Sequence, residues 1–303
     1  MSKKILKPTT KAHIAVLFTN IFFASNYSMV KYVSPSLVGP YGLNIIRVGV
    51  SLLLFWLLWM MGKNIKAGIK KEHLGRFLLC GLSGVAINQM LFIKGLTMTS
   101  TIHASLLMLC TPLLITLLAF WILKEKVTIV KIMGLTMGVG GAILLISSKE
   151  VSGTASLNGD IFIILNAISY TFYFILVKPL MQAYSPLHVM RWVFTLGFIM
   201  ILPFGWGQFA VIDWPGFEWS HIASLAFIVV CGTFLAYSFN LYGIRHLGAG
   251  ITGSYIYTQP VLAAIVAMLF LNENFTWQKV IAAVLIFTGV FLVSRKTPPV
   301  VTE

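Results

Sequence analysis

The feature that most constrains this chain of 303 residues is a succession of apolar segments, each about 20 residues long, that runs from one end to the other. An α-helix of roughly 20 apolar residues spans the hydrocarbon core of a bilayer. Only 10% of the residues are charged, whereas soluble domains carry about a quarter. We therefore expect an all-α integral membrane protein. Its ten predicted spans are His13–Val33, Leu43–Met61, Leu74–Leu96, Ser100–Leu123, Ile129–Ser147, Gly159–Leu180, His188–Trp206, Ser220–Ile244, Ile251–Leu271 and Trp277–Ser294.

The basic residues indicate how these helices are oriented, because Lys and Arg accumulate in the cytoplasmic connections of inserted helices. When the connections are assigned alternately to two faces, 17 of the 22 Lys and Arg residues fall on the face that carries both termini. The sequence thus predicts a multi-pass protein with cytoplasmic N- and C-termini. We interpret the formal net charge of +14 as this topology signal, and expect no nucleic-acid partner.

An internal repeat divides the sequence into two halves, which match at offsets near 148 residues. The matched pairs include Pro112 with Pro260, Glu125 with Glu273, Gly141 with Gly289, Cys80 and Gly81 with Cys231 and Gly232, and Arg47 with Arg191. The polar stretch Ser147–Asn158 joins the halves, so we expect five-helix repeats at residues 1–147 and 148–303. Five is an odd number of spans, and the second repeat is therefore predicted to cross the membrane in the inverted orientation.

Ten spans in two inverted halves, each with a Pro, a Glu thirteen residues later and a Gly in the following helix, resemble the EamA-like family of the drug/metabolite transporter superfamily. The resemblance covers the whole chain. It implies a central cavity lined chiefly by spans 1, 3, 4, 6, 8 and 9, with spans 5 and 10 at the periphery. Members of that family are mostly carriers of the bacterial inner membrane, and many export amino acids and related metabolites. A location in the bacterial inner (plasma) membrane is therefore implied.

Polar side chains within the apolar segments mark the predicted cavity, because such groups are costly in lipid and usually face the bundle interior or water. In span 6, Asn166, Tyr170 and Tyr173 are spaced i, i+4, i+7, which places them on one helix face. The predicted cavity residues are Asn20, Tyr27, Asn88, Gln89, Asn166, Tyr170, Tyr173, Tyr237, Asn240, Thr252, Tyr255 and Gln259. Their neutral amides and phenols suit a small amphipathic or zwitterionic solute. The alternative is that they only link helices through hydrogen bonds.

The charged residues near the spans have structural interpretations. We expect Arg47 and Arg191, three to four residues inside spans 2 and 7, to extend towards the membrane interface; the alternative is that they bind a carboxylate of the substrate. His103 is expected to be a satisfied polar residue near the outer surface; the alternative is that it carries protons. All eight acidic residues lie at span ends, in connections or at the terminus, which favours facilitated diffusion or exchange over proton coupling.

Proline and glycine positions predict how the helices bend and pack. Pro112 and Pro260 each remove an intrahelical hydrogen bond, so we expect kinks in spans 4 and 9. Gly134 and Gly138 form a GxxxG step in span 5, which permits close helix contact. That step could form a dimer face, but we interpret it as packing within the chain and expect a monomer or weak dimer.

No motif points to catalysis: a P-loop, a Rossmann fingerprint and an HExxH pattern are all missing, and the three cysteines lie in apolar runs. We expect no enzyme activity, cofactor or metal. The sequence predicts a secondary carrier, surrounded by membrane lipid, that moves a small-molecule solute such as an amino acid outward by alternating access. The alternatives are a lipid-linked-sugar or nucleotide-sugar carrier, a membrane-embedded enzyme, and a non-transporting receptor or scaffold. The sugar carriers should direct basic residues towards a phosphate, and none is expected in the helix interiors.

Overall fold

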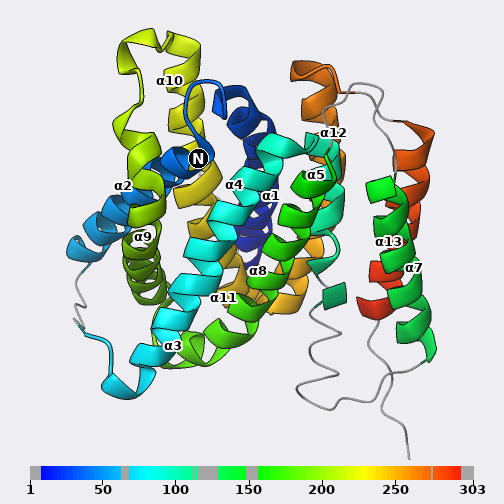
Figure 1. Cartoon of the computed structure of the whole chain (residues 1–303). Coiled ribbons are helices and arrows are strands. Elements are labelled where there is room, and N and C mark those ends of the chain that lie inside the picture. Colours follow the sequence, from blue (N-terminus) through cyan, green and yellow to red (C-terminus); the bar gives the residue numbers. More distant parts are fainter. Residues whose placement is uncertain are drawn as a thin grey trace, which may run out of the picture.

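The computed structural model describes residues 8–62, 68–111, 113–114, 129–147, 156–273 and 276–294, which form an all-α bundle without a strand (Figure 1). The α-helices are α1 (Pro8–Val33), α2 (Pro40–Met60), α3 (Lys71–Gly81), α4 (Ile87–Met98), α5 (Thr101–Met108), α7 (Ile129–Ser147), α8 (Leu157–Ala183), α9 (Pro186–Ala210), α10 (Trp219–Ala226), α11 (Ala236–Ser254), α12 (Gln259–Phe270) and α13 (Trp277–Ser294). The irregular helical segments are π-helical η1 (Leu82–Ala86) and η3 (Phe227–Leu235), and 3₁₀-helical η2 (Trp214–Gly216) and η4 (Tyr255–Thr258).

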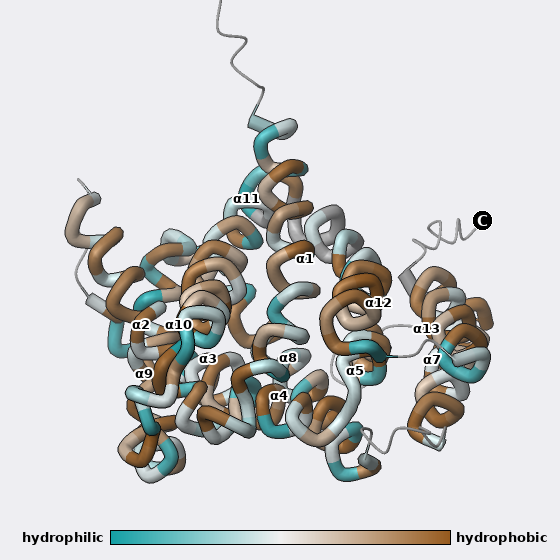
Figure 2. Tube along the Cα trace, turned by 90° about the horizontal axis from the view of Figure 1, so that it is seen from above, coloured by the Kyte–Doolittle hydropathy of each residue, from teal (hydrophilic) through white to brown (hydrophobic). Residues whose placement is uncertain are grey.

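Six helical stretches are long and apolar enough to cross a membrane: Pro40–Met60, Lys71–Met98, Ile129–Ser147, Leu157–Ala183, Pro186–Ala210 and Trp219–Leu247. Shorter apolar helices cover Tyr255–Phe270 and Trp277–Leu292. Helix α1 is 26 residues long but carries many polar side chains. It lies at the centre of the bundle, where it packs against α4, α5, α11 and α12 (Figure 2). These helices confirm the predicted all-α, multi-pass membrane fold and are compatible with ten spans.

Serine and proline residues determine where several helices begin. The hydroxyls of Ser100, Ser156 and Ser185 each accept a hydrogen bond from the backbone N–H three residues further on, which caps α5, α8 and α9. Pro40 and Pro186 occupy the first turns of α2 and α9, where a residue without an N–H costs no hydrogen bond. As a result, α2 and α9 begin two to three residues earlier than the apolar runs indicate.

Helices of the first half, up to α7, pack against helices of the second half, from α8 onward. Helix α2 packs on α9, α5 on α12 and α7 on α13, and each of these pairs joins repeat-related spans. Helix α1 packs on α11, and α4 packs on α8, so span 1 meets span 8 in the way that span 6 meets span 3. This reciprocal pattern is the one that a two-fold axis between like units produces.

Two repeat-related positions carry π-helix. Segment η1 directly follows Cys80 and Gly81, and η3 contains the matching Cys231 and Gly232. In η3, the Thr233 hydroxyl donates a hydrogen bond to the backbone carbonyl five residues earlier, at 2.8 Å, which fixes the side chain against the widened turn. π-Helical turns within α-helices occur frequently at functional sites.

Helices α7 and α13 form a pair at one edge of the bundle, as the resemblance implies for spans 5 and 10 (Figures 1 and 2). Their contact depends on glycine, because a methyl group added at Gly289 would lie 2.5 Å from the Gly134 carbonyl oxygen and 2.5 Å from the Gly138 nitrogen. The GxxxG step therefore packs within the chain, which confirms that interpretation.

The ninth span differs from the predicted segment. Helix α11 continues to Ser254, and η4 separates it from α12, which begins at Gln259. Pro260 lies in the first turn of α12, so the break in the helix precedes it rather than falling within a continuous span. The matching Pro112 lies outside the residues that the structure describes.

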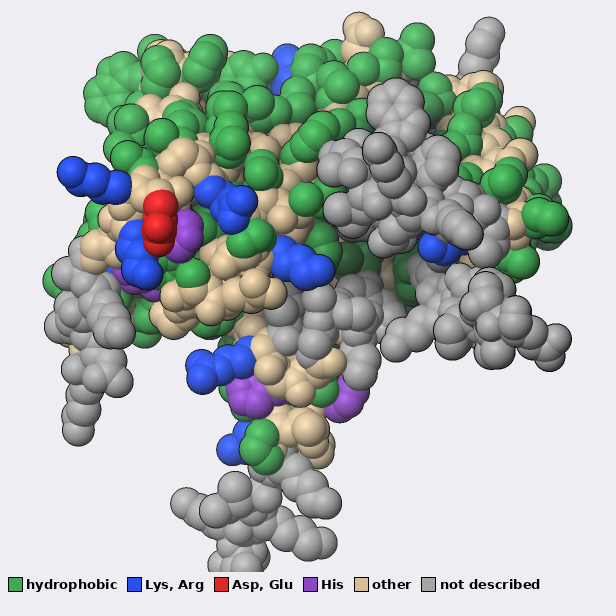
Figure 3. All heavy atoms as spheres, turned by 90° about the horizontal axis from the view of Figure 1, so that it is seen from below, with side chains coloured by type: hydrophobic (Ala, Val, Ile, Leu, Met, Phe, Trp, Pro, Cys, Tyr) green, Lys and Arg blue, Asp and Glu red, His purple; other side chains and the backbone are tan. Residues whose placement is uncertain are grey.

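Basic side chains gather on one face of the bundle (Figure 3). Exposed basic residues that the predicted topology assigns to the cytoplasmic side include Lys11, Lys70, Lys71, Arg76 and Arg245. The side of the membrane that this face occupies stays a prediction.

Candidate functional site

A cavity lies between the two halves, with walls from α1, α2, α4, α5, α8, α11, η4 and α12. It encloses about 900 Å³ of space outside protein atoms, part of which is open solvent. Ten of the twelve predicted cavity residues line it: Asn20, Tyr27, Asn88, Gln89, Asn166, Tyr170, Tyr237, Asn240, Thr252 and Gln259. Their role in transport stays a prediction.

The other two predicted residues lie elsewhere. Tyr173 is buried against η1, and a methyl group added at Gly84 would lie only 2.2 Å from the tyrosine ring. Seven residues advance a helix by about 10 Å, so Tyr173 shares the face of Asn166 but lies beyond the cavity. The Tyr255 hydroxyl forms a hydrogen bond with His13 Nδ1 at 2.8 Å, near the start of α1.

Several cavity amides join helices of opposite halves. Asn88 and Asn166 form a reciprocal pair between α4 and α8, in which each Nδ2 donates to the other residue's backbone carbonyl, at 3.3 and 2.7 Å. Gln259 Nε2 on α12 donates to Asn20 Oδ1 on α1 at 2.8 Å. These hydrogen bonds match the alternative interpretation, but the same residues line the cavity and two of their helices meet there from each half.

The phenol of Tyr237 is held in a fixed position in the cavity wall. Gln89 Nε2 donates a hydrogen bond to the Tyr237 hydroxyl at 2.8 Å. The rings of Phe23 and Phe194 meet the Tyr237 ring edge-on, with centroids 5.8 and 5.5 Å away. Since its oxygen accepts from Gln89, the hydroxyl proton of Tyr237 is available as a donor.

Arg47 contradicts the prediction that it extends to the interface. Because α2 begins at Pro40 rather than Leu43, Arg47 lies about 10 Å inside the helix and only 2% of it is exposed. Its Nε donates to Thr233 Oγ1 of η3 at 3.2 Å, and the side chain lines the cavity. The expectation that the helix interiors hold no basic residue is therefore wrong for Arg47.

Arg191, the repeat counterpart of Arg47, is also buried, which corrects the same prediction. Its guanidinium lies over the ring of Trp59 at 3.8 Å, with Trp56 at 4.8 Å and Trp192 at 5.5 Å. Cation–π contacts of this kind stabilise a charge that is removed from water. Its Nη2 also contacts His188 Nδ1 at 3.1 Å, and Arg191 does not line the cavity.

Sequence reasoning missed several other lining residues. Thr19 and Asn26 line the cavity and repeat the seven-residue spacing of Asn20 and Tyr27 one position earlier, so this signal was present. Thr111 and Arg47 also belong to the lining. The apolar part of the wall, Phe23, Phe92, Met108 and Ile256, carries no polar signal that could distinguish it from core.

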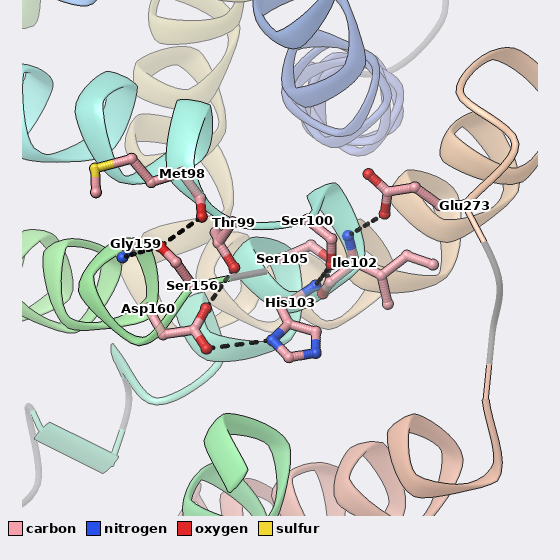
Figure 4. Close-up of polar contacts among 10 residues, drawn as sticks. All are labelled: Met98, Thr99, Ser100, Ile102, His103, Ser105, Ser156, Gly159, Asp160 and Glu273. Atoms are coloured by element: carbon pink, nitrogen blue, oxygen red, sulfur yellow. Dashed lines mark hydrogen bonds and ion pairs between the residues drawn. The ribbon is translucent and has the colours of Figure 1, made fainter. Parts of the chain in front are cut away.

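A second polar cluster surrounds the start of α5, outside the cavity (Figure 4). Asp160, in the first turn of α8, is 1% exposed; it accepts a hydrogen bond from the Thr99 hydroxyl, and its second oxygen lies 3.3 Å from His103 Nδ1. His103 is thus a satisfied polar residue, as predicted. The burial of Asp160 shows that an acidic residue at a span end can still be enclosed by the bundle.

Glu273 extends this cluster by covering the N-terminus of α5. One carboxylate oxygen accepts a hydrogen bond from the backbone N–H of Thr101 at 2.8 Å. The other accepts from the backbone N–H of Ile102 at 3.1 Å (Figure 4). Lys31 of α1 forms an ion pair with the same carboxylate at 3.5 Å. A negative charge at a helix N-terminus is stabilised by the helix dipole. The matching Glu125 lies outside the described part of the chain.

Comparison of the sequence with known proteins identifies its family. The sequence profile of the EamA-like transporter family matches residues 10–147 and again residues 157–295. The uncharacterized transporter YetK of Bacillus subtilis is 28% identical over 257 residues, which cover 82% of this chain and 76% of YetK. A protein of Streptantibioticus cattleyicolor named "Probable terminal-alkyne amino-acid exporter" is 26% identical over 72% of each chain.

A solved crystal structure shares the fold, with a TM-score of 0.62 and 15% sequence identity over 93% of this chain and 96% of the other. The matches to the family profile cover most of the sequence, in the two segments that the internal repeat predicts to be alike. The chain belongs to the EamA-like transporter family.

Proposed function

We propose that this protein is a secondary carrier that exports a small metabolite, such as an amino acid, by alternating access across the bacterial inner membrane, with both termini in the cytoplasm. The observation that carries the proposal is the cavity, because neutral amides and phenols from both halves converge there between apolar and aromatic side chains. A relative named as an amino-acid exporter supports the choice of solute.

The helix pairs across the cavity support alternating access. Inverted-repeat carriers place their substrate near the midplane and rock one repeat against the other. Here the hydrogen bonds between Asn88 and Asn166 and between Asn20 and Gln259 link opposite halves at the cavity wall. Rocking exchanges such bonds for bonds to solute or water, at a cost of only about 1 kcal/mol each.

The proposed mode of transport is facilitated diffusion or exchange, which is driven by the gradients of the solutes themselves and not by a proton gradient. No acidic residue lines the described cavity, so no carboxylate there is placed to carry a proton together with the solute. A strong uptake driven only by an imposed pH gradient in liposomes would contradict this part of the proposal.

Counterflow tests transport directly. Liposomes that contain the purified protein, loaded with an unlabelled amino-acid mixture, should transiently accumulate labelled amino acids from outside. A receptor or scaffold would bind the solute without accumulating it. The absence of counterflow for the whole mixture, by a protein that is folded in the same liposomes, would refute amino-acid transport.

Variants then test the cavity. We expect Asn166→Ala and Tyr237→Phe to reduce counterflow by about 10-fold, because each removes one hydrogen bond at the wall. Protein abundance should stay normal in both variants. The matched control is Tyr32→Phe, which removes an exposed phenol that bonds Ser220 outside the cavity. Unaltered transport by both cavity variants would remove the assignment of this site.

A further inference from the structure

Arg47 is the one charged residue in the described wall of the cavity. It is 2% exposed, and Thr233 Oγ1 is the sole hydrogen-bond acceptor that the described residues offer to its guanidinium. Its Nη1 is buried without an acceptor there. An ion removed from water without a partner costs several kcal/mol, so this arrangement calls for an anionic partner.

The contact with Thr233 orients the guanidinium. The Thr233 hydroxyl donates its own proton to the Ile228 carbonyl at 2.8 Å, so a lone pair of its oxygen accepts from Arg47 Nε. This leaves the Nη1–Nη2 edge of the planar fork for a ligand. Two parallel N–H groups on that edge match the two oxygens of a carboxylate.

We infer that Arg47 binds the carboxylate of the transported solute, so that the cavity selects small monocarboxylates with an apolar body, among them apolar amino acids. This inference rests on the proposed transport function and specifies its substrate class. One guanidinium neutralises one negative charge, whereas a diphosphate would bring further charges that no described cavity residue matches. The aromatic wall, where Tyr27 and Phe92 pack with centroids 5.3 Å apart, suits the apolar body.

Three related probes separate the carboxylate from the rest of the solute: L-leucine, 4-methylpentanoate, which lacks the ammonium group, and L-leucinamide, which lacks the carboxylate. Each is added to the purified full-length chain in detergent, and the melting temperature is followed as a function of concentration. We expect L-leucine and 4-methylpentanoate to raise the melting temperature and L-leucinamide to have no effect. Equal stabilisation by L-leucinamide, or no stabilisation by either carboxylate, overturns the inference.

Variants of Arg47 provide the second arm. Arg47→Gln should weaken binding of both carboxylates about 10- to 100-fold, since it removes charged hydrogen bonds. Arg47→Lys keeps the charge but not the fork, and should weaken binding roughly tenfold; it carries the test if Arg47→Gln does not fold. The control is Arg191→Lys, which alters the repeat counterpart of Arg47 among the tryptophan rings. This variant should still bind the carboxylates in preference to the amide.

The results distinguish this inference from the proposed function. Carboxylate affinities of Arg47→Gln and Arg47→Lys within twofold of the unmodified protein would overturn the role of Arg47. If counterflow of amino acids occurs without any preference for carboxylates over amides, the inference fails and transport stands. If Arg47-dependent binding occurs without counterflow of any solute in the mixture, the binding site stands and the carrier function fails.

Discussion

The substitution Gly232→Ala tests how the π-helical segment η3 positions the cavity wall. A methyl group added at Gly232 would lie 2.3 Å from Asn26 Oδ1 and 2.8 Å from Asn26 Cγ. Ordinary contacts between such atoms exceed 3.4 Å, so the Asn26 side chain or the helices must move by about 1 Å. Overpacking of this size costs about 1 to 3 kcal/mol. Because Asn26 lines the cavity, the displaced amide should also disturb the solute site.

The repeat supplies a matched control in Gly81→Ala. The added methyl group there would lie 3.0 Å from Leu196 Cβ and 3.2 Å from the Gly197 nitrogen, outside the cavity. We expect both variants to lower the melting temperature in detergent, but only Gly232→Ala to reduce counterflow when transport is normalised to folded protein. If Gly232→Ala melts within 1 °C of the unmodified protein and transports normally, the close packing of η3 on Asn26 is refuted.

Two further predictions concern stability. Asp160→Asn should lower the free energy of unfolding by about 1.5 to 3 kcal/mol, because the buried carboxylate bonds Thr99 and contacts His103. Chemical denaturation in micelles would measure this, and a loss no larger than that of the exposed control Asp213→Asn would contradict it. Gly289→Ala should cost about 1 to 3 kcal/mol by forcing α7 and α13 apart, whereas Gly140→Ala, with no atom within 4 Å of the added methyl group, should be neutral or stabilising. Equal melting temperatures of the two alanine variants would refute the close helix contact.

The sequence predicts the fold well because its main determinants are local. Segment length and hydropathy identify the spans, and the GxxxG step at Gly134 correctly predicts close helix contact. The side-chain spacing also predicts which helix faces turn inward, as for Asn166 and Tyr170. Spacing gives the face but not the depth along the axis, which is why Tyr173 shares that face and still lies outside the cavity.

The depth of the charged groups could not be predicted from the sequence. A shift of three residues in the start of α2 moves Arg47 about 5 Å deeper, and the position of Pro40 rather than hydropathy decides that start. The contact between His103 and Asp160 joins residues 57 positions apart, so only the packing of α5 on α8 brings them together. Single-residue boundaries and long-range contacts thus limit the prediction of the site more than that of the fold.

The two halves share a scaffold but differ in what they offer their repeat-related arginines. Arg47 meets the hydroxyl of Thr233, which orients its guanidinium. At the offset that matches Cys80 with Cys231, the counterpart of Thr233 is Leu82, which has no polar atom in its side chain. Thr233 of the second half therefore accepts a hydrogen bond from Arg47 of the first half, whereas Leu82 at the matching position of the first half has no side-chain acceptor to offer.

The aromatic cage is equally one-sided. Trp56 and Trp59 of α2 enclose Arg191, and at the offset that matches Arg47 with Arg191 their counterparts are Met200 and Pro203, neither of which presents an aromatic face to a cation. A guanidinium stacked among indoles is stabilised without an anion, whereas one that lacks such a cage depends on a hydrogen-bonded partner. Two identical halves would carry two equivalent cations at these positions. Divergence at these few positions leaves one of them facing the cavity, which is the arrangement that a solute with a single carboxylate requires.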